Sequence, residues 1–303
     1  MLFYVYTLFE YAKVGKKDYN EDVGGDDMKK LFAFTLSLAM MVVPVYAQRA
    51  LYQVGKTSYT NIERALEKAN DKQNIVVKSD ITKPKDLTYS LNKKVTIDGQ
   101  KHRFTSKKIT VYKGHITLKN SHLKASIITV NKGASLTLEK SHVQAVIINH
   151  GTISGDAATL KASKIENFAK MTMIKTTVNG NIYNLSQLLI KSGTYQNIVQ
   201  NNAPKALLTI KNGTFKELSV YSGLVNISGG NFTGETSFYQ EKGKVSGGTF
   251  NVDHLTNYAD GMKVTGSNLK SIIISRSLRA SFYFISMGAL HTFLVNSPYY
   301  VIK

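Results

Sequence analysis

After Lys72 the chain consists of short runs in which Val, Ile, Leu and Thr alternate with polar residues, and this texture continues to about residue 270. Alternation with a period of two is typical of β-strands with one buried face, and the runs are separated by Gly, Asn, Ser and Lys, as in turns. One segment has helical spacing instead. A capping box at 60–63 begins it, and apolar residues follow at Ile62, Ala65, Leu66 and Ala69. The pattern predicts an all-β fold with one short amphipathic helix at about 60–70.

The strand-like runs form a repeat. Segment 116–128 matches 136–148 position by position, and 189–195 matches 209–215, both at an offset of 20 residues. Segments 226–232 and 244–250 continue the series. We assign one equivalent apolar position to each repeat, which divides 167 residues into nine steps: Ile97, Leu118, Leu138, Leu160, Ile174, Ile190, Ile210, Ile227, Val245 and Val264.

A repeat this short and without a helix cannot bury its own apolar face, so it has to stack on its neighbours. A β-propeller needs about 40 residues per repeat, and a left-handed hexapeptide helix has a strict six-residue rhythm, so neither fits. We therefore expect a single-stranded right-handed parallel β-helix, a solenoid, over residues 48–270. The amphipathic helix at 60–70 is expected to cap its first coil, which would otherwise expose a sheet edge.

The segment 28–47 has the pattern of a secretory signal peptide. Lys29 and Lys30 precede an apolar run at 31–43, and Ala47 ends the segment with a small residue. The apolar run is too short to span a bilayer as a helix. The alternative is a buried N-terminal helix. We expect an exported bacterial protein, secreted or held at the cell surface.

Both ends of the chain fall outside the repeat. A signal peptide that begins at Met28 makes residues 1–27 a mis-assigned upstream extension, and codons available for 24–27 can encode a ribosome-binding sequence before that Met. A genuine N-terminal extension is the alternative. Residues 271–303 are expected to form either a C-terminal cap or an aberrant tail, and their apolar stretch at 282–295 is too short for a transmembrane anchor.

The amino-acid composition excludes some kinds of site and favours one kind of partner. The chain has no Cys, which excludes disulfide scaffolds, zinc ribbons and cysteine nucleophiles. It has 39 Lys and Arg against 20 Asp and Glu, a formal net charge of +19, which favours an anionic partner. Nucleic acid is not expected, because exposed aromatic residues are not interleaved with the basic ones. The recurring Tyr195, Phe215, Phe232 and Phe250 are instead interpreted as stacked core or turn residues.

The position that follows each assigned apolar residue is often lysine. These positions are Lys119, Glu139, Lys161, Lys175, Lys191 and Lys211, and the alignment predicts that the five lysines form one outward stripe. Like charges in register repel each other, and an anionic polymer lying along the stripe would relieve that repulsion. The alternative is that these lysines only keep exposed strands soluble and unpaired.

Catalytic and metal-binding signatures are sparse. The repeat region contains nine acids, and in our alignment no two of them occupy the same place in consecutive coils. Asp98, in an Ile-Asp-Gly segment, is interpreted as a turn residue. His122 and His142 fall at the same place in consecutive coils, about 5 Å apart on one face, but a metal site normally needs a third ligand. We therefore assign no catalytic residue, no metal site and no cofactor, while a carboxylate pair assembled from distant turns stays open.

Three segments carry a resemblance to a known superfamily. Residues 60–69, 74–78 and 95–102 resemble the N-terminal cap and first coils of pectate-lyase-like right-handed parallel β-helix proteins. The Gly-Gly-Thr-Phe repeats and the lysine-rich surface are most similar to the non-catalytic adhesive-type domains of bacterial surface proteins. The superfamily also contains lyases and hydrolases, so the resemblance implies a fold and leaves the function open.

These observations together predict a function. We expect a secreted or cell-surface binding or adhesion protein, monomeric, that recognises an acidic polysaccharide or cell-envelope polymer without catalysis. The alternative is a polysaccharide lyase or glycoside hydrolase that acts on acidic polysaccharide.

Overall fold

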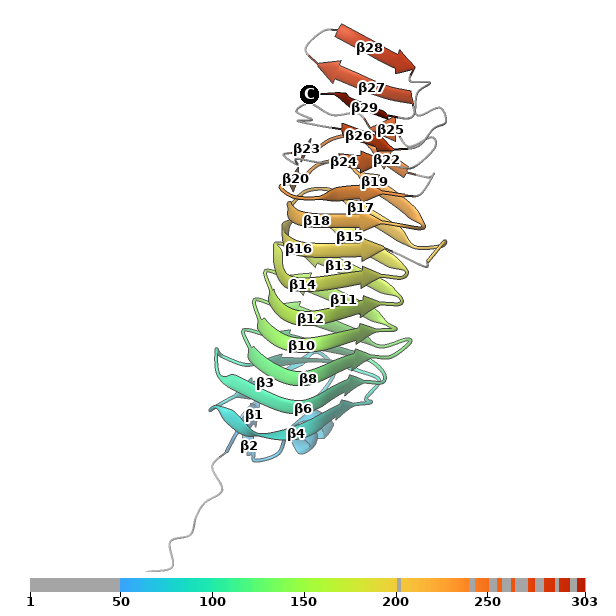
Figure 1. Cartoon of the computed structure of the whole chain (residues 1–303). Coiled ribbons are helices and arrows are strands. Elements are labelled where there is room, and N and C mark those ends of the chain that lie inside the picture. Colours follow the sequence, from blue (N-terminus) through green and yellow to red (C-terminus); the bar gives the residue numbers. More distant parts are fainter. Residues whose placement is uncertain are drawn as a thin grey trace, which may run out of the picture. The chain divides into compact units, whose positions relative to one another are not determined.

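A computed structural model describes residues 50–200, 203–239 and 243–250, and beyond them the strand segments 255–257, 263–264, 272–275, 281–286, 289–294 and 299–302. The predicted extension at 1–27 and the signal peptide at 28–47 lie outside the described residues, as does much of 271–303. From Ala50 onward, strands stack coil upon coil and pair in two long sheets (Figure 1).

Each described coil gives one strand to each of the two sheets, and neighbouring coils pair in parallel. The first sheet contains β2 (Thr57–Tyr59), β1 (Tyr52–Val54), β3 (Gln73–Val77), β5 (Lys94–Asp98), β7 (His115–Lys119), β9 (Ser135–Glu139), β11 (Thr152–Asp156), β13 (Lys170–Ile174), β15 (Gln187–Ile190), β17 (Leu207–Ile210), β19 (Leu224–Ile227), β22 (Gly243–Val245) and β25 (Lys263–Val264). Only β1 breaks the parallel pattern among the described strands of this sheet, because it pairs antiparallel with β2 and β3.

The second sheet contains the longer, bent strands, which Figure 1 shows in front. The long ones are β4 (Ile81–Tyr89), β6 (Arg103–Val111), β8 (His122–Val130), β10 (His142–Asn149), β12 (Thr159–Asn167), β14 (Thr176–Asn184), β16 (Gly193–Gln200) and β18 (Thr214–Val220). The short strands β21 (Thr236–Phe238), β24 (Leu255–Asn257) and β26 (Ile272–Ser275) continue the sheet, and β29 (Tyr299–Ile302) pairs antiparallel with β26. The strand β20 (Asn231–Phe232) lies beside β18, and β23 (Thr249–Phe250) lies beside β20. The strands β27 (Ser281–Ser286) and β28 (Ala289–Leu294) form an antiparallel pair.

The predicted stacking of like residues is confirmed, and with it the parallel β-solenoid. Ile97, Leu118 and Leu138 are partners in register on β5, β7 and β9, and all three are buried. Buried and half-buried residues alternate along these strands because alternate side chains point inward. The right hand of the coil and the pectate-lyase-like superfamily stay predictions.

Two of the ten assigned positions were wrong. Leu160 lies on β12 in the second sheet, where it pairs with Val143 and Val178. In the first sheet, the residues in line with Leu138 are Gly155 and then Met173, and Ile174 is one position too late. The apolar signal failed at Gly155 because it has no side chain. A Cβ there would lie 2.8 Å from the sulfur of Met173, so the methionine fills the space instead.

The core contains an aromatic stack. The rings of Tyr195 and Phe215 lie 5.2 Å apart between centroids, and those of Phe215 and Phe232 lie 4.8 Å apart, with interplanar angles of 11° and 16°. All three side chains are buried, which confirms their interpretation as stacked core residues. The side chain of Phe250 lies outside the description, but its backbone pairs with Phe232.

A buried amide ladder runs through the same core. Asn149, Asn167, Asn184 and Gln200 end β10, β12, β14 and β16, and each is fully buried. The Nδ2 of each asparagine donates to the side-chain oxygen of the next residue in the series, at 2.7, 2.9 and 2.7 Å. Hydrogen bonding of this kind is what allows amides to occupy a core.

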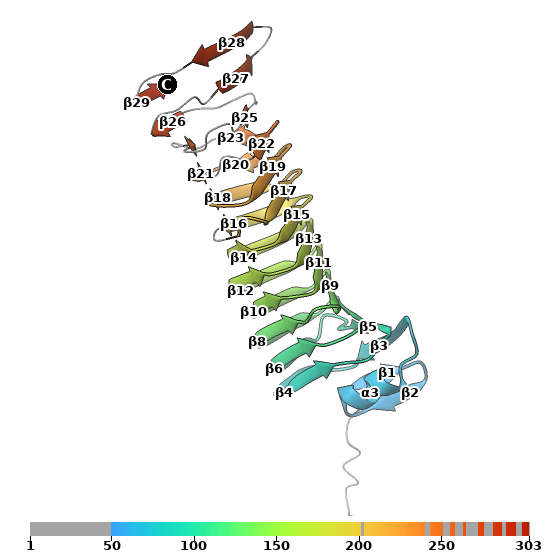
Figure 2. The same ribbon diagram turned by 90° about the vertical axis from the view of Figure 1, so that its right-hand side faces the viewer.

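The helix α3 spans Ile62–Lys68, so it is shorter than predicted. Its N-cap is Asn61 rather than Thr60, since Asn61 Oδ1 accepts hydrogen bonds from the backbone N–H groups of Glu63 and Arg64 at 2.7 and 3.3 Å. Its apolar face is buried, and Figure 2 shows the helix beside β1 and β2. Its role as a cap on the first coil stays a prediction.

Candidate functional site

The five predicted lysines do not lie on one stripe. Lys119 ends β7 in the first sheet, whereas Lys161 lies on β12 in the second sheet, between Gln144 and Asn179 in register. The remaining three lie in or beside turns that lead from the first sheet into the second. The prediction failed because Lys161 and Lys175 were placed by the two wrongly assigned apolar positions. Whether any of the five binds a ligand stays a prediction.

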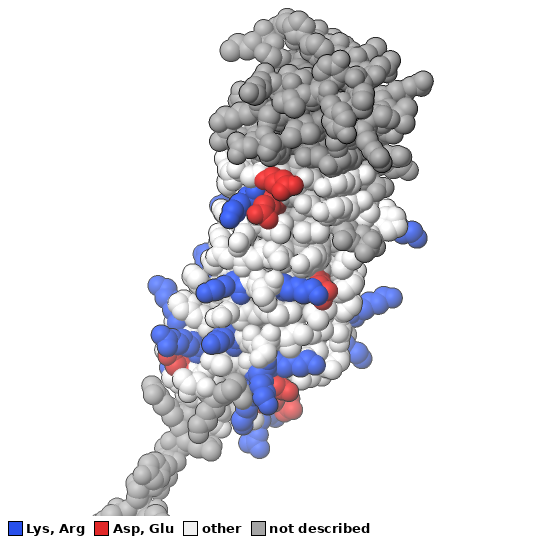
Figure 3. All heavy atoms as spheres, viewed as in Figure 1, with Lys and Arg blue, Asp and Glu red and all other residues white. Residues whose placement is uncertain are grey.

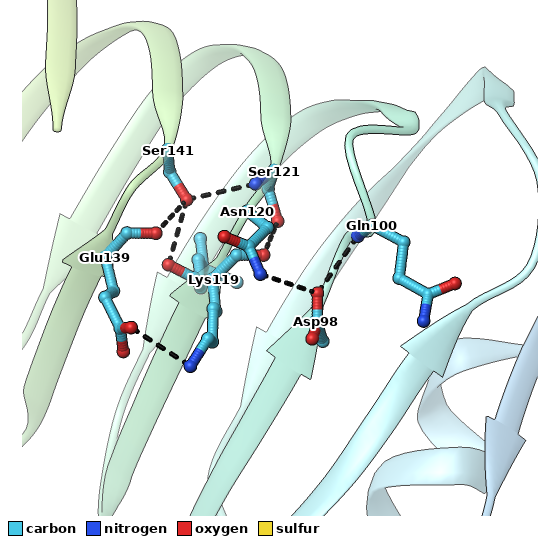
Figure 4. A network of polar contacts seen from close by, with 8 residues as sticks. Asp98, Gln100, Lys119, Asn120, Ser121, Glu139 and Ser141 are labelled. Carbon is cyan, nitrogen blue, oxygen red and sulfur yellow. Dashed lines mark hydrogen bonds and ion pairs between the residues drawn. The ribbon is translucent and has the colours of Figure 1, made fainter. Parts of the chain in front are cut away.

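Lys119 has an acidic neighbour on each side in its own column. In register, the column runs Asp98, Lys119, Glu139 and Asp156. The Nζ of Lys119 lies 3.0 Å from Oε1 of Glu139, and Figure 4 shows the two side chains pointing toward each other. Lys119 is therefore neutralised locally and is a poor candidate for an anion site.

The same column corrects the expectation about acids. Glu139 and Asp156 are register partners on adjacent strands, so two acids do share the same place in consecutive coils. Asp98 has the turn role predicted for it, because its Oδ1 accepts hydrogen bonds from Gln100 N at 3.0 Å and from Asn120 Nδ2 at 3.3 Å (Figure 4). Glu139 and Asp156 are thus placed as a pair that could act on a substrate together.

A second feature is an open groove of about 600 Å³ at the turns between the sheets, close to Lys175, Lys191 and Lys211. We call it the turn groove. It crosses four consecutive coils, and its lining consists of glycines and small polar residues: Ser192, Gly193, Asn212, Gly213, Thr214, Gly229, Gly230, Asn231, Gly248 and Thr249. None of these lining residues is charged, so the floor of the turn groove offers hydroxyl, amide and backbone groups.

Tight stacking of the coils explains the glycines. Gly193 has φ +131°, and a Cβ on it would lie 2.0 Å from the backbone oxygen of Thr176 in the preceding coil. No side chain fits at such a position, and this backbone region is essentially restricted to glycine. Because Gly213, Gly230 and Gly248 also have positive φ, the same bare backbone recurs in each following coil. The result is a hollow that follows the stacking direction.

One wall of the turn groove is a column of polar side chains. Thr214, Asn231 and Thr249 line the turn groove as register partners on β18, β20 and β23, and Thr194 on β16 continues their column beyond it, so one hydroxyl or amide group recurs in every coil. Neighbouring strands lie about 4.8 Å apart, which sets the repeat distance of these groups. A ligand that repeats along its own length could meet each coil in the same way.

Three of the predicted lysines border this groove. The backbone N–H of Lys175 donates to Ser192 Oγ at 3.0 Å, while Lys191 and Lys211 directly precede Ser192 and Asn212. Lys191 and Lys211 follow the register partners Ile190 and Ile210, so they occupy the same place in consecutive coils. All three lysines are exposed. The neutral floor therefore has a cationic border, and a cation at such a place attracts anionic ligands.

The histidine pair is placed as predicted. His122 and His142 are register partners on β8 and β10, and their ring centroids lie 4.9 Å apart in a T-shaped arrangement. Within the described part of the chain, no group of three His, Asp or Glu side chains is arranged to hold a metal ion. The pair is exposed and lies on the outer face of the second sheet.

The turn groove itself was not foreseen from the sequence. Its signal was present in the dipeptides Ser192-Gly193, Asn212-Gly213, Gly229-Gly230 and Gly247-Gly248, each followed by Thr or Asn and an aromatic residue. These were recognised as repeated turns. That the turns stack to form one continuous hollow depends on register, which the sequence alone did not supply.

No protein-family model, curated protein or solved structure matched this chain. No helix in the described residues combines the length and the apolar character that crossing a membrane requires.

Proposed function

We propose that the protein binds an extended anionic polymer, an acidic polysaccharide or cell-envelope polymer, along the turn groove and without catalysis. One observation carries this proposal: the turn groove has the same kind of polar lining over four coils, and exposed lysines border it on two of these coils and on the coil before them. Lys175, Lys191 and Lys211 replace the five-residue stripe as the proposed cationic contacts.

The repetition matters because each contact is weak by itself. A single exposed ion pair contributes about 0–1 kcal/mol and is screened by salt. Several such contacts on one rigid scaffold act together, because after the first contact the others form within one molecule. The threonine and asparagine wall adds hydrogen bonds that suit sugar hydroxyls, and the lysines suit the acidic groups.

The proposal includes the setting predicted from the sequence. We infer export to the cell surface or medium from the signal-peptide pattern, and a pectate-lyase-like right-handed coil capped by α3 from the resemblance of the first coils. A solenoid that displays one repeated groove is well suited to an adhesive role at a bacterial surface, because its binding face lengthens with every coil.

The test is retention of the full chain on immobilised polygalacturonate. The variant K175Q/K191Q/K211Q should elute at clearly lower salt than the unaltered protein. The control K56Q/K68Q/K78Q removes three exposed lysines near the N-terminal coils and changes the net charge equally. The control should elute close to the unaltered protein. Equal losses in both variants would show that binding follows only the net charge, and the proposal would then be wrong.

The pair Glu139 and Asp156 favours a second candidate, a glycoside hydrolase or polysaccharide lyase. Glycosidases use two carboxyl groups on either side of the scissile bond, and these two side chains start from adjacent strands. Incubation with polygalacturonate in the presence of Ca²⁺, followed in the ultraviolet and by reducing ends, tests both reactions. Sustained product that disappears in E139Q would establish an enzyme and remove the non-catalytic reading.

A further inference from the structure

The polar wall of the turn groove belongs to a longer column. Continuing from Thr194 toward the N-terminal coils, the register partners are Thr177, Thr159, His142, His122 and Arg103. One outward position therefore changes from hydroxyl groups to two imidazoles and a guanidinium along the same sheet. We call the last three residues the basic end of the column.

The basic end is crowded with nitrogen-bearing groups. The rings of His122 and His142 are 4.9 Å apart with an interplanar angle of 62°, and Arg103 is the register partner of His122 on the next strand. All three side chains are exposed. Figure 3 shows basic side chains gathered over β4 to β14 on this face, with single acidic side chains among them and further acidic ones near β18. An anionic group placed at the basic end could contact all three residues.

The groups that face the two histidines are cationic or neutral. The adjacent outward column, two residues further along each strand, contains Thr105, Lys124, Gln144 and Lys161 in register, and Thr159 follows His142 in the histidines' own column. No acid occupies these outward positions of β6, β8, β10 and β12. An anionic group at the basic end would therefore meet no acidic side chain in these two columns.

Asp80 is the acid that adjoins the basic end, and it is already engaged. Its Oδ1 accepts a hydrogen bond from the backbone N–H of Arg103 at 3.0 Å and lies 3.1 Å from Nδ1 of His102. These two contacts hold the pKa of Asp80 below its usual range. Asp80 thus serves the turn before β6, and the exposed side chain of Arg103 is left available to a ligand.

We propose that the basic end, formed by Arg103, His122 and His142, binds an anionic group of the polymer and that its affinity increases on acidification. The proposal rests on the proposed function, because the same polymer would run from the turn groove along the threonine column. An anion bound here favours the protonated imidazoles, so ligand binding and proton uptake assist each other by linkage. The shared ligand chemistry is an oxyanion such as a sulfate, phosphate or carboxylate.

The test uses dextran sulfate immobilised on agarose, because its sulfate groups stay ionised throughout the range in which imidazoles titrate. Retention of the full chain should strengthen between about pH 8 and about pH 5.5, with an affinity gain of about three- to tenfold. The variant H122Q/H142Q should lose most of this gain. The variant R103Q, which leaves the histidines in place, should weaken retention at both pH values.

A matched control removes two other histidines. The pKa of His115 is lowered by burial and by nearby Lys94. His150 directly follows β10, at the opposite end of that strand from His142, and stacks on Phe168. The variant H115Q/H150Q should therefore keep the pH-dependent gain. An unchanged gain in H122Q/H142Q, or no gain in the unaltered protein, would overturn the inference. Full retention of K175Q/K191Q/K211Q at the higher pH would instead overturn the proposed function, so the two failures are distinguishable.

Discussion

The side-chain amide of Asn167 donates a hydrogen bond from Nδ2 to Oδ1 of Asn184 over 2.9 Å, and both side chains are fully buried. The same Nδ2 group also donates to the backbone oxygen of Gln187 at 2.8 Å, in the strand that begins the next coil. Asn167 thus joins the coils twice, through a side chain and through the backbone. The amide ladder forms a continuous hydrogen-bonded polar seam in a mainly apolar core.

Replacing Asn167 by Leu should lower the free energy of unfolding by about 2–4 kcal/mol, because Asn184 Oδ1 and the Gln187 carbonyl would lose a buried donor. Equilibrium unfolding in urea measures the change. The control is N197A, which removes a longer bond of 3.3 Å between half-buried amides on the outer face. It should cost less than about 1 kcal/mol. A similar loss in both variants would show that the seam contributes nothing beyond ordinary amide pairing.

Gly193→Ala should be among the most damaging single substitutions. The new Cβ would lie 2.0 Å from the Thr176 oxygen, so two coils would have to separate, with an expected loss of at least about 3 kcal/mol. Gly133→Ala is the control, since Gly133 also has positive φ but no atom lies within 4 Å of the added Cβ. Only backbone strain of about 1–2 kcal/mol applies there. Thermal and urea unfolding of the two variants should therefore separate clearly.

The parallel solenoid could be predicted because its signal is redundant. Segments 116–128 and 136–148 align without a gap and share most of their apolar and polar positions, and one faulty repeat does not change the conclusion. The register of a single coil has no such redundancy. At Gly155 the inward side chain is absent, so the alignment moved to Leu160 in the other sheet. The outward residues inferred from that coil and the next, Lys161 and Lys175, were therefore misplaced as well, and the predicted lysine stripe was wrong.

The amide ladder and the turn groove were missed for a related reason. Asn and Gly are common in turns, so Asn149 or Gly193 can be interpreted locally without any reference to the next coil. Their roles depend on which residue lies one coil away. Asn167 accepts a hydrogen bond from Asn149, and the Thr176 oxygen lies too close to Gly193 to leave room for a Cβ. By contrast, the pairing of His122 with His142 was predictable because both lie in the two coils that match position by position.

Phe215→Ala should destabilise the protein by about 3–5 kcal/mol, because the ring is buried between Tyr195 and Phe232 and its loss leaves a cavity. Phe168→Ala is a useful comparison. Phe168 is also stacked, on His150 at 4.7 Å, but it is 43% exposed. Its removal should cost less than about 1.5 kcal/mol. If urea unfolding gave equal losses, burial would not be what makes the inner stack stabilising.

Two buried tyrosines predict a loss of stability at alkaline pH. Burial, with a smaller contribution from Asp71, raises the pKa of Tyr89 to about 12, and burial raises the pKa of Tyr195 well above its usual range. Their hydroxyls donate to the backbone oxygens of Lys93 and Ser192. The folded state keeps both phenols neutral, whereas the unfolded chain ionises them near pH 10. Stability is therefore complete below about pH 10 and decreases as the pH rises toward 12.

The double variant Y89F/Y195F tests this pH dependence, since phenylalanine keeps the ring and removes the ionisable group. The urea midpoint of the unaltered protein should fall between about pH 9 and about pH 11, and the double variant should show a smaller fall. Lysines titrate in the same range, so the control Y112F/Y221F is needed. Those two tyrosines are 47% and 45% exposed, and their variant should follow the unaltered protein. If all three proteins lost stability in parallel, the alkaline transition would belong to other groups.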